Sequence, residues 1–350
     1  PLQVFIGGKP ATILFRGRNA CCSSVDTVYV TVPVGLSGCA VSVNMQVGNL
    51  VSNTTSIAVA PTGRTCTPVS SNSTGGGTGT HSYGGFAIER IDESFTVAGT
   101  TTNTKMDMVA GSFEKTTYST TPPQGSQLDV NSYGSCTVST QTAGQGNPSS
   151  NGSTQYLDAG ASVALSAPFG NRTLAKSSPG AGLILYSANL DQTATTLTPG
   201  QYVLTGTGGA DVGPFTANYT MAPPLLWTNR PPSTTTVNRA AGLTITWTGG
   251  APDGYVTISG TNTYYGATAK SNVTVTFTCT ARASDGTFTV PPIVLLALPP
   301  TASAPGGSFT IPGSLIVTNV GNVQGFGPPS GVEAAAISSV FIYASSATFQ

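Results

Sequence analysis

The stretch Asn272–Thr280, which reads NVTVTFTCT, decides the fold class of this 350-residue chain. From Val273 to Thr280 every second residue is apolar, and each residue in between is a threonine. A period of two places successive side chains on opposite faces of a β-strand, so the segment is expected to bury one face and expose the other. The same alternation recurs in three other segments: Val25–Pro33, Ala40–Gly48 and Leu243–Gly250.

Glycine- and proline-rich turns separate the alternating runs, for example Gly249–Gly254 (GGAPDG) and Ser284–Thr287 (SDGT). Ser330–Ser339 (SGVEAAAISS) is the one segment with the composition of a helix. Many short strands joined by such turns are typical of β-sandwiches. The sequence therefore predicts an all-β protein with two to three tandem immunoglobulin-like β-sandwich domains.

Changes in composition suggest where the domains end. We expect an immunoglobulin-like module at 1–65, a Gly/Ser-rich linker at 66–82, a β-sandwich at 83–222 and a C-terminal β-sandwich at 223–350. The last boundary is placed in a proline cluster, Met221–Ser233. The first module is shorter than the roughly 100 residues of an immunoglobulin domain, so it is expected to lack strands.

The chain carries few charges: 7% of its residues are charged, and 13 basic residues balance 13 acidic ones. Binding to nucleic acid needs a basic surface, which this balance argues against. Little self-repulsion favours association between copies. The longest apolar run, Ile293–Leu298, is too short to span a bilayer. An even number of cysteines suits disulfides in an oxidising compartment, so an extracellular or cell-surface protein is expected.

Three disulfides are expected from the six cysteines: Cys21, Cys22, Cys39, Cys66, Cys136 and Cys279. Neighbouring side chains of an extended chain point to opposite faces. The adjacent pair at 21 and 22 is therefore expected to take one partner each from the cysteines at 39 and 66, with the connectivity left open. The two remaining cysteines, which lie on separate alternating strands, would form the third bridge. Their spacing does not match a zinc site, so no metal or cofactor is expected.

Several segments resemble a known type of module. The turn Ile6–Ala11 (IGGKPA), the turn Val32–Cys39 (VPVGLSGC) and the stretch Gly48–Ala60 (GNLVSNTTSIAVA) resemble the IPT/TIG immunoglobulin-like module of uncharacterised secreted β-rich proteins of acidobacterial type. The resemblance continues in Leu197–Phe215. It implies an exported bacterial protein of repetitive β architecture, and it implies no activity. Related sequences usually carry strands upstream of the first of these turns.

The sequence offers little for catalysis, and no catalytic residue is expected. The single histidine, His81, lies in the expected linker, where a catalytic group would lack fixed geometry. The acidic residues Glu89, Asp92 and Glu93, with Asp107 on a neighbouring strand, are the one cluster that paired-carboxylate chemistry would use. We interpret them as a solvated strand edge, partly neutralised by Arg90 and Lys105.

Aromatic residues give a second functional hypothesis. Tyr264 and Tyr265 are the best candidates for contact with a glycan, although a turn-flanking or subunit-contact role is favoured. Trp247 alternates with apolar residues and is expected in the core. Asn72 and Asn151, in Asn-x-Ser/Thr sequons of loop-like segments, are candidate glycosylation sites.

These features favour an extracellular structural protein, a self-associating subunit of a surface fibre or layer assembled by β-strand complementation. The partner would be further copies of the chain. The donated strand is expected to carry either Leu2 and Val4 or the C-terminal Val340, Ile342 and Phe349. A monomeric cell-surface adhesion or carbohydrate-binding protein is the alternative, and a polysaccharide hydrolase using Glu89 or Asp92 ranks third.

Overall fold

The computed structural model describes residues 2–7, 9–18, 26–36, 38–47, 50–51, 55–60, 79–118, 133–143, 152–180, 182–191, 197–231, 234–266, 270–301 and 312–350. Nearly every element in these ranges is a strand, which confirms the all-β fold. The two exceptions are the short 3-10 helix η1 (Ala283–Asp285) and the helix α1 (Pro292–Leu296). No helix in the described ranges is long and apolar enough to cross a membrane.

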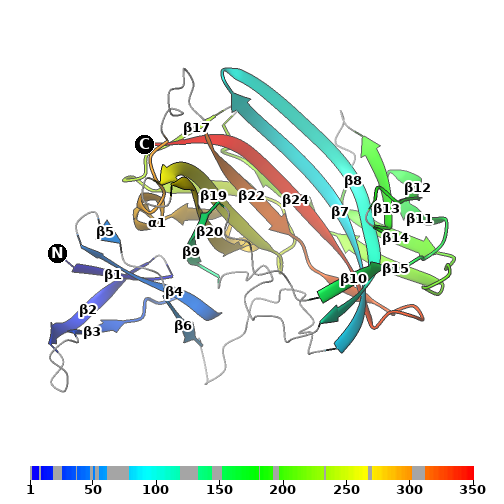
Figure 1. Ribbon diagram of the computed structural model, residues 1–350, viewed down its shortest axis with the longest axis horizontal. Helices are drawn as coiled ribbons and strands as arrows, with labels where there is room; N and C mark the ends of the chain where they lie inside the picture. The colour runs from blue at the N-terminus through cyan, green and yellow to red at the C-terminus, as the bar shows by residue number, and fades with distance from the viewer. Residues whose placement is uncertain are drawn as a thin grey trace.

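A small sheet forms the first module (Figure 1). Its strand order is β3-β2-β1-β4-β5, and β6 also pairs with β4. The long strand β2 changes partner along its length: its first residues pair with β1, and Thr12–Arg18 pair with β3. The strands are β1 (Leu2–Ile6), β2 (Lys9–Arg18), β3 (Asp26–Thr31), β4 (Gly38–Val47), β5 (Leu50–Val51) and β6 (Thr55–Val59).

A 15-stranded sheet makes up most of the rest of the chain, with the order β15-β14-β11-β12-β13-β8-β7-β24-β22-β19-β20-β9. Strand β10 also pairs with β8, and β17 and β23 pair with β24. Its strands are β7 (Gly79–Val97), β8 (Thr100–Tyr118), β9 (Ser135–Thr142), β10 (Gly152–Tyr156), β11 (Ser162–Ala167), β12 (Gly170–Ser177), β13 (Leu185–Asp191), β14 (Gly200–Gly206), β15 (Phe215–Met221), β17 (Thr235–Val237), β19 (Tyr255–Gly266), β20 (Ser271–Arg282), β22 (Gly313–Val320), β23 (Gln324–Phe326) and β24 (Ala334–Phe349). A three-stranded sheet completes the fold: β16 (Leu226–Trp227), β18 (Leu243–Thr248) and β21 (Thr287–Val290).

The boundary expected between residues 222 and 223 does not separate two sheets. Strand β24 runs parallel to β7 from Ala334 to Ser345, and β9 pairs with β20. Strands from both sides of the boundary therefore share one sheet and one connected apolar core. The proline cluster is therefore a connection between strands of one domain and not a boundary between two domains. The expected linker is also shorter, because residues 79–82 already belong to β7.

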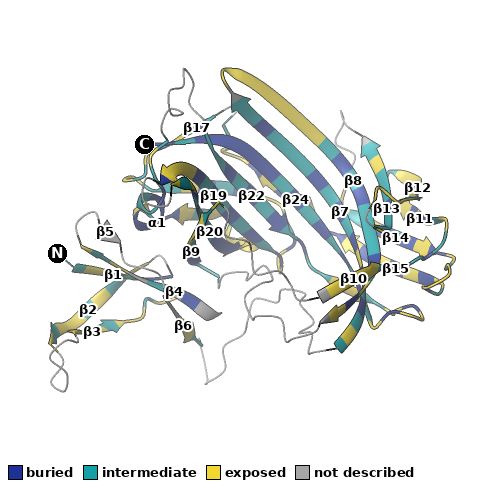
Figure 2. Cartoon of the chain, viewed as in Figure 1, coloured by how far each residue is buried: buried dark blue, intermediate teal, exposed yellow. Residues whose placement is uncertain are grey.

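Two layers cover the same face of the central strands. On β24, the Ser339 hydroxyl lies 2.9 Å from the Tyr219 hydroxyl of β15, and Tyr343 donates to the main-chain oxygen of Leu225, 2.6 Å away. Residues 339 and 343 share one face of the strand. The curled strands β11–β15 thus pack at one end of that face, and the three-stranded sheet packs at the other. The opposite face of β24, with Val340 and Ile342, is half-exposed (Figure 2).

The segment expected to be helical is a strand. Ser330–Ser339 runs through a turn into β24, whose residues alternate between buried and half-buried up to Tyr343. Pairing with β7 on one side and with β22 and β23 on the other overrides the helix propensity of the alanines.

Glycines inside the strands mark close ring contacts. Four glycines lie directly opposite a phenylalanine on the neighbouring strand, and a Cβ atom on any of them would overlap that ring. Because glycine has no side chain, each ring can lie flat over the opposite backbone. The pairs are Gly84–Phe113, Gly111–Phe86, Gly206–Phe215 and Gly260–Phe277.

Candidate functional site

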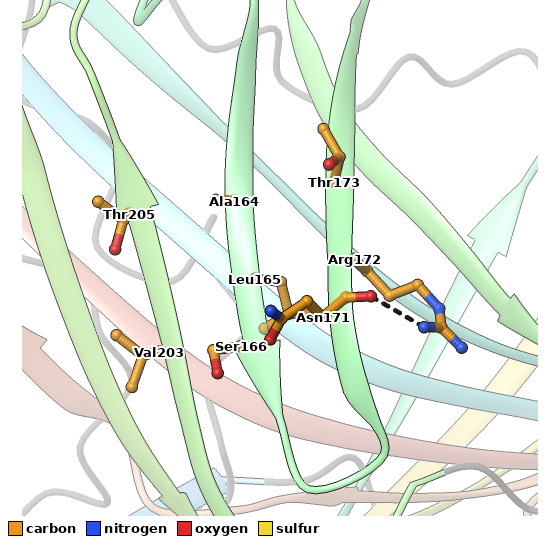
Figure 3. Close-up of a pocket in the computed structure, with 8 residues that line it drawn as sticks. All are labelled: Ala164, Leu165, Ser166, Asn171, Arg172, Thr173, Val203 and Thr205. Atoms are coloured by element: carbon orange, nitrogen blue, oxygen red, sulfur yellow. Dashed lines mark hydrogen bonds between the residues drawn. The ribbon is translucent and has the colours of Figure 1, made fainter.

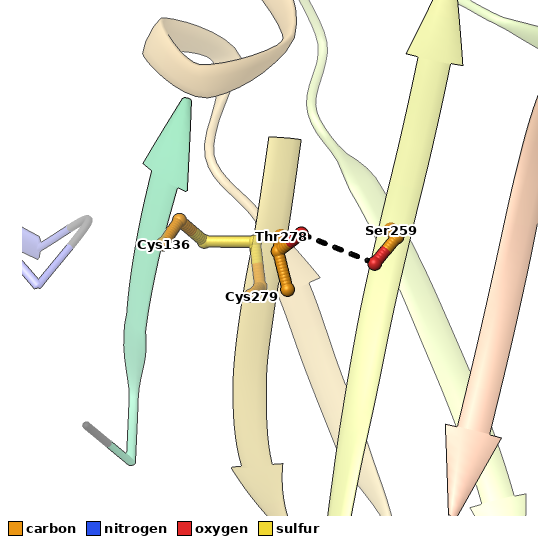
Figure 4. The surroundings of a disulfide bond; sticks show 4 residues. All are labelled: Cys136, Ser259, Thr278 and Cys279. Carbon is orange, nitrogen blue, oxygen red and sulfur yellow. Dashed lines mark hydrogen bonds between the residues drawn. A yellow bond between two sulfur atoms is a disulfide. The ribbon is translucent and has the colours of Figure 1, made fainter. Parts of the chain in front are cut away.

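The third expected disulfide is present. Cys136 of β9 and Cys279 of β20 lie directly opposite each other, with Cα atoms 4.0 Å apart, and are bonded to one another (Figure 4). Both are buried on the core face, while Thr278 and Ser259 share a hydrogen bond on the other face. The alternation in Asn272–Thr280 therefore positions the sulfur correctly, since Cys279 has the same parity as Phe277.

The other expected covalent sites are not described by the structure. Cys21, Cys22 and Cys66, together with the sequon residues Asn72 and Asn151, lie outside the described residues. The backbone of Cys39 belongs to β4, but its side chain is not described. The pairing of these four cysteines and any glycosylation stay predictions.

The acidic residues do not lie on a sheet edge, because β7 is paired on both sides by β8 and β24. Asp107 is buried and accepts two hydrogen bonds of 2.7 Å from Arg90, which lies opposite it. Asp92 pairs with Arg230 at 2.6 Å. Two guanidinium groups thus hold both aspartates as parts of a polar junction beneath the two covering layers.

Glu89 points away from that junction. It is three positions from Asp92 along an extended strand, so the two carboxylates lie on opposite faces and cannot flank one glycosidic bond. Its cross-strand neighbours on the uncovered face are Met108 and Val340. Burial against these apolar neighbours raises the pKa of Glu89 above its ordinary value. This geometry argues against the hydrolase hypothesis.

His81 lies on β7 and not in a linker. Its Nδ1 atom is 3.0 Å from Oε2 of Glu333, just before β24, and its ring stacks near Tyr83. The pair lies at the end of the β7–β24 pairing where both strands begin, next to the first matched residues, Tyr83 and Ala334. In the described part of the chain, no group of three His, Cys, Asp or Glu side chains is close enough to hold a metal ion.

The two tyrosines proposed for glycan contact are both exposed, Tyr264 by 42% and Tyr265 by 56%. They are neighbours on strand β19, so their side chains leave opposite faces and do not form one platform.

A shallow hollow of about 320 Å³ lies elsewhere, on β11, β12 and β14 (Figure 3). Its lining is small and mostly polar, and Arg172 points away from the other residues, donating to the main-chain oxygen of Asn171. With one charged residue and no acid, histidine or cysteine, this hollow offers no catalytic arrangement.

Neither expected donor strand is free. Strand β24 is hydrogen-bonded on both sides, and Phe349 is fully buried in its own core. Strand β1, which carries Leu2 and Val4, is paired by β2 and β4 and contributes Val4 to the module core. The apolar residues of a strand do not show which other strands will flank it, and the expectation of a free donor strand is therefore wrong for both segments.

Many residues of the first module are exposed (Figure 2), and among the described residues the exposed large apolar side chains are concentrated there. Among the side chains of the module that the structure describes, four apolar ones form its buried core: Val4, Ile6, Leu36 and Val41. Of the eleven most exposed large apolar side chains in the described ranges, eight belong to it: Leu14, Phe15, Tyr29, Val32, Val34, Met45, Val47 and Ile57. Alternation in the sequence correctly places Tyr29 on the opposite face of its strand from Val28 and Val30. It does not show that exposed apolar side chains are concentrated in this module.

No family model and no curated protein matches this chain. The likeness to the IPT/TIG module therefore stays a prediction. The features that bear on function are the exposed apolar side chains of the first module and the ends of its sheet, as the described strands define them.

Proposed function

We propose that the protein is an extracellular structural protein that self-associates, as the subunit of a surface fibre or layer. The observation that carries this proposal is the cluster of exposed apolar side chains on the first module, where Leu14 is 69% and Tyr29 61% exposed. Exposed apolar side chains gathered in one part of a soluble protein mark association sites. The small core of the module makes covering that surface by a second molecule favourable.

Strand complementation is the proposed mode of contact. One end of the first sheet is β3, and the other is formed by β5 and β6, which both pair with β4; sheet ends recruit additional strands. Because β1 and β24 are paired within their own sheets, the donor is an end strand of another copy and not either terminal strand. The near absence of charge lowers the electrostatic cost of such contacts.

The bridge between Cys136 and Cys279 supports an oxidising, extracellular location. A monomeric adhesion or carbohydrate-binding protein remains the alternative, and the exposure of Tyr264 and Tyr265 is the observation that favours it.

Oligomeric state decides between the two. We expect the full chain to give species larger than a monomer by light scattering coupled to gel filtration, increasing with concentration, and regular assemblies by electron microscopy. A monodisperse monomer at every concentration would overturn the proposal. A glycan-array signal from that monomer, abolished by combining Tyr264→Ala with Tyr265→Ala, would establish the alternative.

A further inference from the structure

Strand β3 lies at the outer end of the first sheet, where β2 is its one partner among the described strands (Figure 1). Natural proteins usually protect such ends with charged residues, prolines or bulges, because an open edge pairs readily with another strand. Strand β3 carries one charge, Asp26, at its first position, and its other five residues are uncharged. The central part of this edge therefore has no charge or proline of its own, and the register shift opposite it, between Ile13 and Phe15, lies on β2.

The uncharged part of β3, Thr27–Thr31, reads TVYVT and is identical in both directions. Antiparallel partners run in reverse, so such a strand matches a second copy of itself about its centre. Pairing centred on Tyr29 places Val28 opposite Val30 of the partner subunit. We propose that two copies of this chain associate by antiparallel pairing of their β3 strands around a two-fold axis at Tyr29. This inference rests on the self-association proposed above and specifies one contact that produces it.

The side chains on both faces of β3 fit this arrangement. On the outer face, the ring of Tyr29 lies beside that of Phe15 on β2, with ring centres 5.4 Å apart, and both are exposed. Across the axis the same pair repeats, so four rings form one stripe over four strands. On the inner face, Val28 and Val30 pack against the module core, and the pairing extends that core into the second copy.

Charges do not oppose the contact. In the same register Asp26 lies opposite Val32 of the partner subunit, and not opposite a second carboxylate. With a rise of about 3.4 Å per residue, the two Asp26 residues are about 20 Å apart, beyond the screening length in physiological salt. An isologous contact that uses one edge twice closes at two copies.

Paired charge variants at the axis test the proposal on the full chain by sedimentation velocity. Tyr29→Lys and Tyr29→Glu each place two like charges opposite one another, and each alone is expected to dimerise at least about tenfold more weakly than the wild type. Mixed in equal amounts, they should regain a dimer, because the axis then holds opposite charges. Val34→Lys is the matched control: Val34 is 91% exposed in the turn that follows β3, beyond the residues that pair in this register, so dimerisation should not change.

Cross-linking gives an independent measurement. Directly opposed residues in an antiparallel pair have Cα atoms about 4.5–5.5 Å apart, within reach of a disulfide. Tyr29→Cys should therefore form a covalent dimer on oxidation, and Val34→Cys should not. If the wild type self-associates while the Tyr29 variants associate equally well and fail to cross-link, the β3 contact is wrong and the proposed function stands. A wild type that stays monomeric overturns both.

Discussion

Replacement of Arg90 by methionine is expected to destabilise the protein strongly. The Arg90 and Asp107 side chains are 7% and 1% exposed and share two hydrogen bonds of 2.7 Å. With charge centres about 4 Å apart and an effective dielectric of about 20, their attraction is about 4 kcal/mol. Breaking a buried pair by removing one partner typically costs about 3–5 kcal/mol, because the other charge stays buried. We expect Arg90→Met to lower the free energy of unfolding by this amount in guanidinium chloride titrations.

Two comparisons isolate the cause. The double variant Arg90→Met with Asp107→Leu removes both charges and is expected to recover most of the loss, since apolar replacement of a whole buried pair is often neutral. Asp92→Asn weakens a more exposed ion pair, in which the Arg230 side chain is 14% and the Asp92 side chain 27% exposed. This change should lower the free energy of unfolding by at most about 1.5 kcal/mol. A double variant as unstable as Arg90→Met alone would refute the argument that an uncompensated charge is responsible.

Three further outcomes follow from the same structure. Trp227 and Trp247 both lie in the three-stranded sheet, which shares one apolar core with the 15-stranded sheet. Unfolding measured by tryptophan fluorescence should therefore have the same midpoint as unfolding measured by circular dichroism, which reports mainly on the 15-stranded sheet. Separate midpoints would show that the two sheets unfold independently. Gly84→Ala should cost about 1–3 kcal/mol in the same titrations because its Cβ atom would overlap the Phe113 ring, whereas Gly85→Ala has no atom within 4 Å and should cost much less. Glu89→Gln should stabilise the protein at pH 7. Because burial raises the pKa of Glu89, the folded wild type loses stability as the pH rises above the ordinary pKa of glutamate, whereas the variant does not. Below that pH the advantage of the variant should vanish. Equal stabilities of wild type and variant across the pH range would contradict the burial of this carboxyl.

The sequence predicts which face of a strand a residue occupies better than it predicts which strands pair with each other. Alternation in Asn272–Thr280 correctly buries Phe277 and Cys279, and the parity of Trp247 correctly places it in the core, 3% exposed. Both are local properties of an extended chain. The pairing of β24 with β7 joins segments about 250 residues apart, and nothing in either segment specifies the other. For this reason the domain boundary near residue 222, the free donor strand and the solvated acidic edge were all expected from the sequence and are not found.

The partners of the buried charged side chains in the polar junction could not be predicted from the sequence either. The sequence brings Asp107 near the acidic residues of β7, and the structure places it opposite Arg90 as a bidentate partner. Arg230 enters from a distant segment to neutralise Asp92 and also donates to the main-chain oxygen of Ala344. Counting charges along one segment therefore overestimated how acidic and how solvated this region is.

The two-fold contact at β3 constrains any larger assembly. Because isologous pairing closes at two copies, a fibre or layer requires a second, different contact, and its repeating unit should be a dimer with a two-fold axis through Tyr29. Tyr29→Lys should then abolish that axis and leave the second contact intact, so the variant should give smaller or thinner assemblies instead of none. Electron microscopy of both proteins measures this directly. Wild-type fibres whose repeat is a single copy, related to the next by rotation and translation alone, would show head-to-tail contacts and refute the β3 pairing.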